Sequence, residues 1–355
     1  MVRAETYNRY KEIVKFHEAN CSSPIASDPE AELKLVAPLG ALKVKRDAVQ
    51  EKYNEIVAAL TAMRTKHPIP EKKIWPAHRE SDEALGFLLG DLHFGKFSEI
   101  DNETVFSLEI AKTRFEQIVQ NARHLWEAYM KSVHKIEDVH VFFVGDLIDG
   151  EQIYQTQAWN SELPVVKQVT FAADIIKKNL LTWASKEFTN VYIHSVQGNH
   201  GEVRGSGGES TFHWQSNFDT LLANMLEFGC AELPNVHFDI GYDRIHIAKV
   251  KKFKVPGEHK FMMMHKGPGT PQTAYGRSRF GGWYQRFRYD AFLTGHYHNF
   301  SYNNFNGIPI MQNGALFGSA DDYTMNLAFD GYPTQVLFSI ADKRPIAHFW
   351  PVDLR

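Results

Sequence analysis

The sequence predicts an α/β fold in which two β-sheets are covered by helices, with a helical segment at the N-terminus. Three patterns support this prediction. Short apolar runs alternate with longer helical stretches between residues 84 and 228, closely spaced β segments follow residue 235, and the first 80 residues show helical periodicity. Strands that alternate with helices usually pair in parallel, so we expect the first sheet to be mostly parallel.

Residues 1–80 are expected to form a helical segment that precedes the main domain, residues 81–355. Between residues 46 and 66 the apolar side chains recur at the helical period: Val49, Tyr53, Ile56, Val57, Leu60 and Met63. Prolines at positions 68, 70 and 76 then break the pattern and favour a linker. We interpret the segment as an arm that packs on the main domain or on a second subunit; the alternative is a small DNA-binding or partner-docking module.

The main domain shows a clear order of elements. Apolar runs predict strands over residues 85–89, 141–144 and 191–196, and helical patterns predict helices over residues 108–131, 165–188 and 218–228. A Pro256-Gly257 turn predicts a hairpin over residues 244–265. Further strands, assigned to the second sheet, are expected over residues 308–311, 334–340 and 346–350.

Composition excludes several classes of protein. The net charge of −3 gives no general case for a nucleic-acid or membrane binder, so any polyanion contact requires a local basic patch. Cys21 and Cys230 are isolated, which argues against a disulfide framework or a thiolate zinc site. No apolar run approaches the roughly 18 residues of a membrane helix. We therefore expect a cytoplasmic protein without a membrane partner.

Polar residues follow five short apolar runs, at the point where each predicted strand ends. The five stretches are Gly90-Asp91-Leu92-His93, Gly145-Asp146-Leu147-Ile148-Asp149-Gly150, Gly198-Asn199-His200, the single His265 after residues 261–264, and Gly295-His296-Tyr297-His298. Because parallel strands end at the same edge of a sheet, we expect these side chains to gather there. Histidines outside these stretches, His140, His194, His237 and His246 among them, are expected to have structural or surface roles.

Asp, His and Asn side chains are ligands of borderline divalent metals such as Mn, Fe, Ni, Co and Zn. The five stretches supply enough ligands for two ions. Two ions about 3.5–4 Å apart can share a carboxylate, activate water and hold a phosphoryl group during in-line attack. The chemistry that this pattern favours is the hydrolysis of a phosphate ester.

Taken in order, the five stretches resemble the signature of the calcineurin-like metallophosphoesterases, over about residues 84–300. The resemblance implies a four-layer α/β/β/α sandwich with two divalent metal ions, Mn first among them, at the sheet edge. It also implies the ligands: Asp91, His93 and His298 for one ion, Asn199, His265 and His296 for the other, and Asp146 between them.

The resemblance further implies that His200 lies beside the scissile phosphate as general acid or oxyanion partner, and that Asp149 orients the ligands. Arg204 lies in a glycine-rich loop next to His200, and one interpretation is that it closes over the phosphate and neutralises charge; the alternative is that the loop is only a flexible connection. One position departs from the family, which usually has Asp or Glu directly after Gly-Asn-His; here Gly201 comes first and Glu202 second. Either Glu202 orients His200 from a longer loop, or His200 is held differently.

The substrate is predicted from local composition. Arginines and aromatic residues alternate between the last two motifs, at Tyr275, Arg277, Arg279, Phe280, Trp283, Tyr284, Arg286, Phe287, Arg288 and Tyr289. Such a mixture suits phosphate contact and base stacking; the alternative is an amphipathic helix with Trp283, Phe287 and Tyr289 in the core. Residues 313–323 loosely resemble a region of phage-encoded, nuclease-like metallophosphoesterases.

Our leading hypothesis is a phosphodiesterase that acts on nucleic acid, as a DNA exonuclease or endonuclease. One alternative is a phosphomonoesterase for phosphoproteins or nucleotides, and another is a non-catalytic scaffold of the same fold. The N-terminal helices are the expected contact for a second copy of the chain or for a protein partner.

Overall fold

The computed structural model describes residues 50–62, 83–131, 134–153, 157–204, 216–269, 273–319 and 331–355. Contacts divide the chain into two units, residues 1–55 and 56–355, and the fold described below lies in the second. Residues 50–62 are helical, as expected. The earlier N-terminal helix and the domain boundary at residue 80 lie outside the described residues, so both stay predictions.

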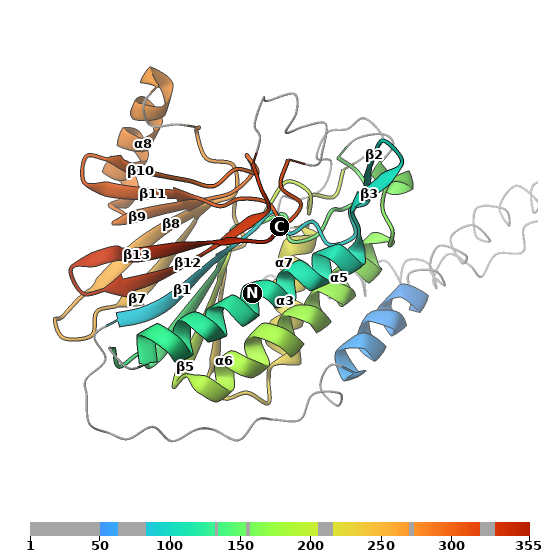
Figure 1. Ribbon diagram of the computed structural model, residues 1–355, viewed down its shortest axis with the longest axis horizontal. Coiled ribbons are helices and arrows are strands. Elements are labelled where there is room, and N and C mark those ends of the chain that lie inside the picture. The colour runs from blue at the N-terminus through green and yellow to red at the C-terminus, as the bar shows by residue number, and fades with distance from the viewer. Residues whose placement is uncertain are drawn as a thin grey trace, which may run out of the picture. The chain divides into compact units, whose positions relative to one another are not determined.

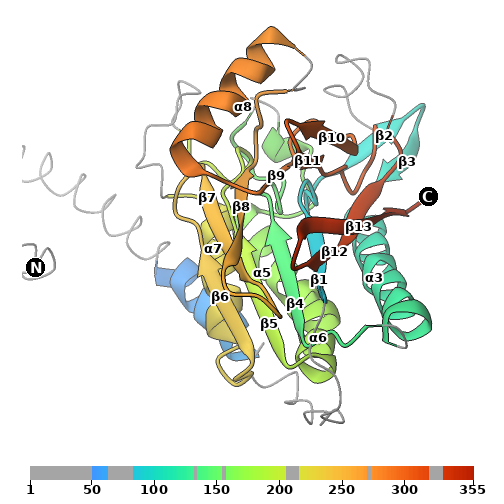
Figure 2. The same cartoon turned by 90° about the vertical axis from the view of Figure 1, so that its left-hand side faces the viewer.

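The first sheet has six strands in the order β13-β12-β1-β4-β5-β6 (Figures 1 and 2). Their bounds are β1 Glu83–Leu89, β4 Asp138–Phe143, β5 Asn190–Ser195, β6 Val236–Ile240, β12 Thr334–Ala341 and β13 Arg344–Asp353. Strands β1, β4, β5 and β6 pair in parallel, as predicted. Every residue of β1 is buried, because this strand has neighbours on both sides and packed layers on both faces.

The second sheet has five strands in the order β10-β11-β9-β8-β7. Their bounds are β7 His246–Lys251, β8 Glu258–Met264, β9 Ala291–Thr294, β10 Ser301–Phe305 and β11 Ile308–Gln312. The predicted hairpin is confirmed as the antiparallel pair β7–β8. A separate two-stranded ribbon, β2 Ser98–Ile100 and β3 Glu103–Phe106, was not predicted.

The assignment of residues 334–340 and 346–350 to the second sheet was wrong. These residues form β12 and β13, and β12 pairs antiparallel with β1, with Leu85 opposite Ser339. The apolar pattern identified the strands correctly, but it carries no information about which open edge they join. Because β12 pairs with β1, buried polar residues of the C-terminal region lie beside the loop that carries Asp91.

Helices cover the outer faces of both sheets. Helices α3 (Leu108–Leu125), α5 (Val165–Ile175), α6 (Thr182–Glu187) and α7 (Phe218–Gly229) lie on the first sheet, and α8 (Ala274–Phe287) lies on the second (Figures 1 and 2). Two π-helical turns, Trp126–Met130 and Ile176–Leu181, continue α3 and join α5 to α6. Helix α3 begins at Ser107, whose hydroxyl accepts a hydrogen bond from the backbone N–H of Ile110.

Three separate hydrophobic clusters correspond to the three interfaces of a four-layer sandwich. Phe87 and Phe115 belong to the cluster between the helices and the first sheet. Phe142 and Phe261 belong to the cluster between the two sheets, where their ring centroids are 5.0 Å apart. Phe292 lies in the third cluster, between the second sheet and α8. The predicted α/β/β/α architecture is therefore confirmed.

Strand register aligns the ends that carry the motifs. Leu89 of β1 is opposite Phe143 of β4, and Phe143 is opposite Ser195 of β5. In the second sheet, Met264 of β8 pairs in parallel with Thr294 of β9. All five strands therefore release their chains at equivalent positions, and the polar residues that follow them emerge at one edge.

The inter-sheet cluster provides a test of this architecture. Phe142 is fully buried and its ring lies 5.6 Å from that of Phe338, centroid to centroid. Phe142→Ala should lower the free energy of unfolding by about 3–5 kcal/mol, because it leaves a cavity between the sheets. Urea denaturation measures the change, with Phe349→Ala as the control, since Phe349 is 37% exposed. Equal losses in the two variants would contradict the four-layer core.

Candidate metal centre

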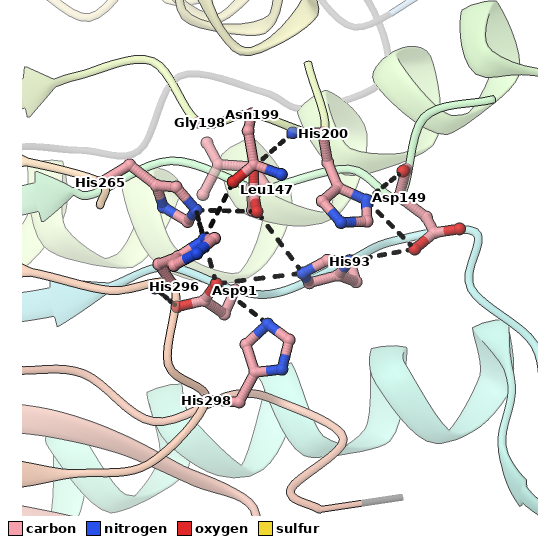
Figure 3. A network of polar contacts seen from close by, with 12 residues as sticks. Asp91, His93, Leu147, Asp149, Gly198, Asn199, His200, His265, His296 and His298 are labelled. Atoms are coloured by element: carbon pink, nitrogen blue, oxygen red, sulfur yellow. Dashed lines mark hydrogen bonds and ion pairs between the residues drawn. The ribbon is translucent and has the colours of Figure 1, made fainter. Parts of the chain in front are cut away.

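The seven predicted ligand side chains lie together at the common edge of the two sheets (Figure 3). Asp91 Oδ1 is 3.5 Å from His298 Nε2, 3.9 Å from His93 Nε2 and 4.0 Å from His265 Nε2. These residues come from loops after three different strands, β1, β8 and β9. One carboxylate oxygen thus faces three imidazole nitrogens.

A second set of donor atoms surrounds Asp146. Its Oδ2 atom is 2.8 Å from His265 Nε2 and 3.8 Å from His93 Nε2. His296 Nδ1 lies 3.3 Å from His265 Nε2 and 3.0 Å from Asn199 Oδ1. Two groups of three donors each fit within 4.8 Å, Asp91 with His93 and His298, and Asp146 with His265 and His296. Either group could hold a divalent cation, with Asn199 beside the second.

The imidazole tautomers direct lone pairs into the cluster. His265 Nδ1 lies 2.8 Å from the carbonyl oxygen of Val144, and because a carbonyl only accepts, we assign the proton to Nδ1. His93 Nδ1 likewise donates to Asp149 Oδ1 at 3.0 Å. When these imidazoles are neutral, the Nε2 atoms of His93 and His265 point lone pairs at carboxylate oxygens, an arrangement that a cation between them would stabilise.

Two atoms at the centre are buried without a hydrogen-bond partner, Asp91 Oδ1 and His93 Nε2. Asp146 Oδ2 is also without an aligned hydrogen bond, although His265 Nε2 is only 2.8 Å away. Buried polar atoms in native proteins are nearly always satisfied, so such a group requires an explanation. The donor set, carboxylate oxygen with imidazole nitrogen, fits a borderline divalent metal.

The electrostatics of the cluster also favour a bound cation. Burial raises the pKa of Asp91 to about 8, and the nearby Asp146 carboxylate adds to the increase while His265 opposes it. Burial lowers the pKa of His265, but the carboxylates of Asp146 and Asp91 outweigh burial and raise it to about 9. Burial and His265 lower the pKa of His296 to about 3. A divalent cation would stabilise carboxylate and neutral imidazole together, the forms in which they bind metal.

Backbone strain is concentrated at the same residues. Five of them have positive φ angles: Asp91 (48°), His93 (45°), Asp146 (52°), His296 (75°) and His298 (55°). This conformation is sterically costly for residues other than glycine, by about 1–3 kcal/mol each, and it persists only where the surroundings enforce it. The other described non-glycine residues with positive φ, Asp101, Asn102, Arg288 and Asn306, lie outside the five motifs.

A buried carboxylate that sequence reasoning missed holds two of the loops together. Asp219 accepts hydrogen bonds from the backbone N–H groups of Asp146 (2.9 Å), Leu147 (3.0 Å) and Gly198 (2.9 Å). It lies in the first turn of α7, whose N-terminal cap is Asn217. The Asn-Phe-Asp sequence at this helix start was the available signal, but it predicts only a helix cap.

The loop after β1 is held by two buried amides that were also missed. Gln335 donates to the carbonyl oxygen of Gly90 at 3.0 Å and accepts from its N–H at 3.1 Å. Asn313 donates to Gln335 Oε1 at 2.7 Å. Gln335 is 245 residues from Gly90 in sequence, so no local pattern indicates this contact.

Asp149 orients both His93 and His200. Its carboxylate accepts from His93 Nδ1, and its backbone carbonyl oxygen lies 2.6 Å from His200 Nδ1. Gln157 Nε2 supports the arrangement, 2.5 Å from the same carbonyl oxygen. The residue after Gly201 does not orient His200, because Glu202 pairs instead with Arg204 and Arg244, each at 3.0 Å. Of the two alternatives, His200 is held differently.

Arg204 lies near the site but its described contacts are elsewhere. Its guanidinium pairs with Glu202, and its backbone N–H donates to Gln152 Oε1 at 2.7 Å. The glycines that follow, at positions 205, 207 and 208, lie outside the described residues, as do residues 320–323 of the stretch at 313–323. The predicted role of Arg204 in charge neutralisation stays a prediction.

Comparison with known proteins gives structural similarities of low score. No protein-family model matches the chain, and no curated protein matches its sequence. The chain is similar to Vps29 of Cryptosporidium parvum, at 14% identity and a TM-score of 0.34, over 77% of this chain and 99% of that chain. It is also similar to Entamoeba histolytica Vps29 complexed with Zn²⁺, at 14% identity and a TM-score of 0.33, over 76% of this chain and 99% of that chain. A third similarity is to an archaeal phosphodiesterase, at 11% identity and a TM-score of 0.33, over 76% of this chain and 99% of that chain.

Among the described residues, no helix is both long and apolar enough to cross a membrane.

Asp219 gives a test of how the centre is built. Asp219→Asn keeps the shape but turns an NH₂ group toward backbone N–H donors, so it should lower the free energy of unfolding by about 1–3 kcal/mol. It should also weaken metal binding about 10–100-fold, because the Asp146 and Gly198 loops lose their common acceptor. Titration with Mn²⁺ measures this change. Asp290→Asn is the matched control, an exposed carboxylate that accepts the Lys260 N–H; equal affinities in the two variants would contradict the positioning role.

Proposed function

We propose that the protein is a metal-dependent phosphodiesterase, with nucleic acid as its substrate class. The observation that carries this proposal is the pair of buried donor groups that meet at Asp91 and Asp146, with His200 at their rim. Two divalent ions bound there would polarise the phosphoryl oxygens and lower the pKa of water. Hydrolysis of a phosphate ester needs both effects.

The chain's own residues would hold the ions in two sets. The first is Asp91, His93 and His298; the second is Asn199, His265 and His296; Asp146 lies between them. All donors are oxygen or nitrogen, which suits Mn, Fe, Ni, Co or Zn, and we propose Mn²⁺ for the first assays. Five of these seven residues, all except Asn199 and His265, have positive φ angles that the surrounding structure enforces, so their donors are held in place before the ions arrive.

His200 is placed to transfer a proton to the leaving oxygen. Its Nδ1 atom is hydrogen-bonded to the backbone carbonyl oxygen of Asp149, so the proton there is fixed and Nε2 is the exchangeable position. Its ring packs edge-on against His93, with centroids 4.3 Å apart. The backbone N–H of His200 also donates to Asp146 Oδ1 at 2.7 Å, which ties the acid to the metal-binding loop.

Two surface features favour a nucleic acid. Helix α8 exposes four arginines and contains no carboxylate in its sequence: Arg277, Arg279 and Arg286 on the helix, and Arg288 at its C-terminal cap. Tyr275 and Tyr284 are exposed on the same helix, and the guanidiniums of Arg279 and Arg288 lie over them. Arginine with exposed aromatic rings suits phosphate contact and base stacking.

Helix α8 is amphipathic, with aromatic residues packed on the second sheet and arginines exposed to solvent, so it agrees with both interpretations of its sequence. Phe280 and Tyr289 are buried and Trp283 is half-buried against Phe292, with parallel rings whose centroids are 6.0 Å apart. The arginines lie on the side that faces solvent. The apolar side therefore secures the helix to the second sheet, and the basic side is available to a polyanion.

The second feature is Trp159, which is 88% exposed. It ends the short helix Gln157–Trp159, and Gln157 Nε2 contacts Asp149 and, at 3.1 Å, His200 Nδ1. An exposed aromatic ring offers a flat face on which a nucleic-acid base can stack. We propose that Trp159 stacks on a base next to the cleaved phosphate.

The direct test is hydrolysis of bis-p-nitrophenyl phosphate and p-nitrophenyl phosphate by Mn²⁺-loaded protein. The diester should be the better substrate, and chelation should abolish the activity. His200→Ala should lower kcat at least about 100-fold, because the acid is lost, while metal content stays at two ions per chain. His348→Ala, which removes an exposed imidazole on β13, is the control.

Other outcomes would replace the proposal. Preference for the monoester would make the protein a phosphomonoesterase. Two bound ions without hydrolysis of either compound would indicate a metal-binding scaffold, and loss of the ions in His200→Ala would assign that residue to the structure of the centre.

Trp159 separates base recognition from chemistry. Trp159→Ala should raise KM for a single-stranded oligonucleotide about 5–100-fold, since stacking on one base contributes about 1–3 kcal/mol. Turnover of bis-p-nitrophenyl phosphate should not change, because that compound has no base. Trp159→Phe should recover most of the affinity. A similar loss on both substrates would place Trp159 in the support of the centre rather than in nucleic-acid recognition.

A further inference from the structure

A second cluster of ionisable side chains lies outside the candidate metal centre. It contains His194 on β5, Asp239 on β6 and His246 on β7, with His140 on β4 behind them. None of these residues belongs to the five motifs. Strand β6 is the last strand of the first sheet and β7 is the last strand of the second, so the cluster joins the two sheets along one side.

Three donor atoms of this cluster converge. Asp239 Oδ2 lies 2.9 Å from His194 Nδ1 and 2.9 Å from His246 Nε2. All three atoms fit within 4.8 Å of one another. His194 is buried, His246 is 16% exposed and Asp239 is 46% exposed, so the donors line a position that solvent reaches from the Asp239 side.

His246 Nε2 is buried and makes no aligned hydrogen bond, although Asp239 Oδ2 is close. A polar nitrogen in that position is costly unless a further partner satisfies it. The same oxygen, Asp239 Oδ2, also faces His194 Nδ1, so one carboxylate oxygen lies between two imidazole nitrogens. A cation among the three atoms would satisfy all of them.

His140 supports His194 from behind. His140 Nδ1 is 3.0 Å from His194 Nε2, and its ring stacks on Tyr192 with centroids 4.8 Å apart. If His194 Nδ1 binds a metal, its Nε2–H donates to His140. Histidine ligands of metals usually donate their other N–H in this way, which fixes the tautomer and the ring orientation.

We propose that His194, Asp239 and His246 form a third divalent-metal site, of the His₂Asp class, for Zn²⁺ or a similar borderline ion. Tetrahedral coordination at bonds of about 2.0–2.1 Å separates ligand atoms by about 3.3 Å, so the 2.9 Å from Asp239 Oδ2 to each imidazole nitrogen requires only a small outward movement. The three protein ligands leave a fourth position for water.

The ion would link the edge strands of the two sheets, β6 and β7. The chain crosses from β6 to β7 through residues 241–245, and these strands belong to different sheets (Figure 2). A metal that ligates residues on β5, β6 and β7 would link them at the side where β6 and β7 are the edge strands of the described sheets. The site is therefore structural in our proposal, and the hydrolytic reaction does not depend on it.

Metal content tests the proposal directly. The full-length protein and three variants are equilibrated with Zn²⁺, desalted and analysed for zinc per chain. His246→Gln and Asp239→Asn should each hold one ion fewer than the wild type. His237→Gln is the matched control, an exposed histidine two residues before Asp239 on the same strand, and it should retain the wild-type content. Equal zinc in all four proteins would overturn the site and leave a hydrogen-bonded cluster.

Thermal unfolding gives a second measurement. Added Zn²⁺ should raise the Tm of the wild type and His237→Gln by about 5 °C more than that of His246→Gln or Asp239→Asn. Asp239→Asn is nearly isosteric and half-exposed, so it tests the site even if His246→Gln fails to fold. An equal shift in all folded variants would overturn this link between the edge strands. Both measurements compare each variant with the wild type, and the expected difference comes from one ion. The result therefore does not depend on how many ions the centre at Asp146 binds.

Discussion

The candidate metal centre depends on one buried interaction, the acceptance of three backbone N–H groups by the carboxylate of Asp219. The loops after β4 and β5 must approach closely for Asp146 and Asn199 to serve the same site. Gly145 and Gly198 permit this approach, because a Cβ on Gly198 would collide with Asp146 itself. Burial raises the pKa of Asp219 to about 6, with the Asp146 carboxylate as the next cause. Asp219 lies in the first turn of α7, where the helix dipole stabilises its negative charge next to Asp146.

Burial and strain at the centre have a common explanation. Two carboxylates and several imidazoles lie in a water-poor space where neither uniform ionisation nor uniform neutrality is favourable. Their backbone conformations are strained as well, and the surrounding amides hold them in place. Proteins are stable by only about 5–15 kcal/mol, so a region with this much strain and buried charge is typical of a functional site. Cations at this position would offset the repulsion between carboxylates and satisfy the buried atoms that lack a hydrogen-bond partner, which is why we propose that this centre binds metal.

The sequence predicted the strand ends well because two local signals coincide there, an apolar run and the polar residues after it. Asp91 and His265 were therefore found without knowledge of any contact. Asp219 and Gln335 were missed because their roles lie in hydrogen bonds to segments 21 to 245 residues away. The same limit explains the wrong sheet for β12, since periodicity shows that a segment is a strand but not which edge it joins.

Helix α8 occupies a particular place in the chain, between the strands that carry His265 and His296. These strands pair in parallel, and a parallel pair requires a crossover connection, which is usually a helix. The crossover is thus demanded by the fold, but nothing in that demand requires exposed arginines or the absence of acidic residues. An ordinary surface helix mixes both charges, whereas this one exposes Arg279 and Arg286 and has no carboxylate in its own sequence. The basic side of this helix is the reason for our proposal that the substrate is an anion that extends beyond the metal centre, as a polymer of phosphodiesters does and a single phosphate group does not.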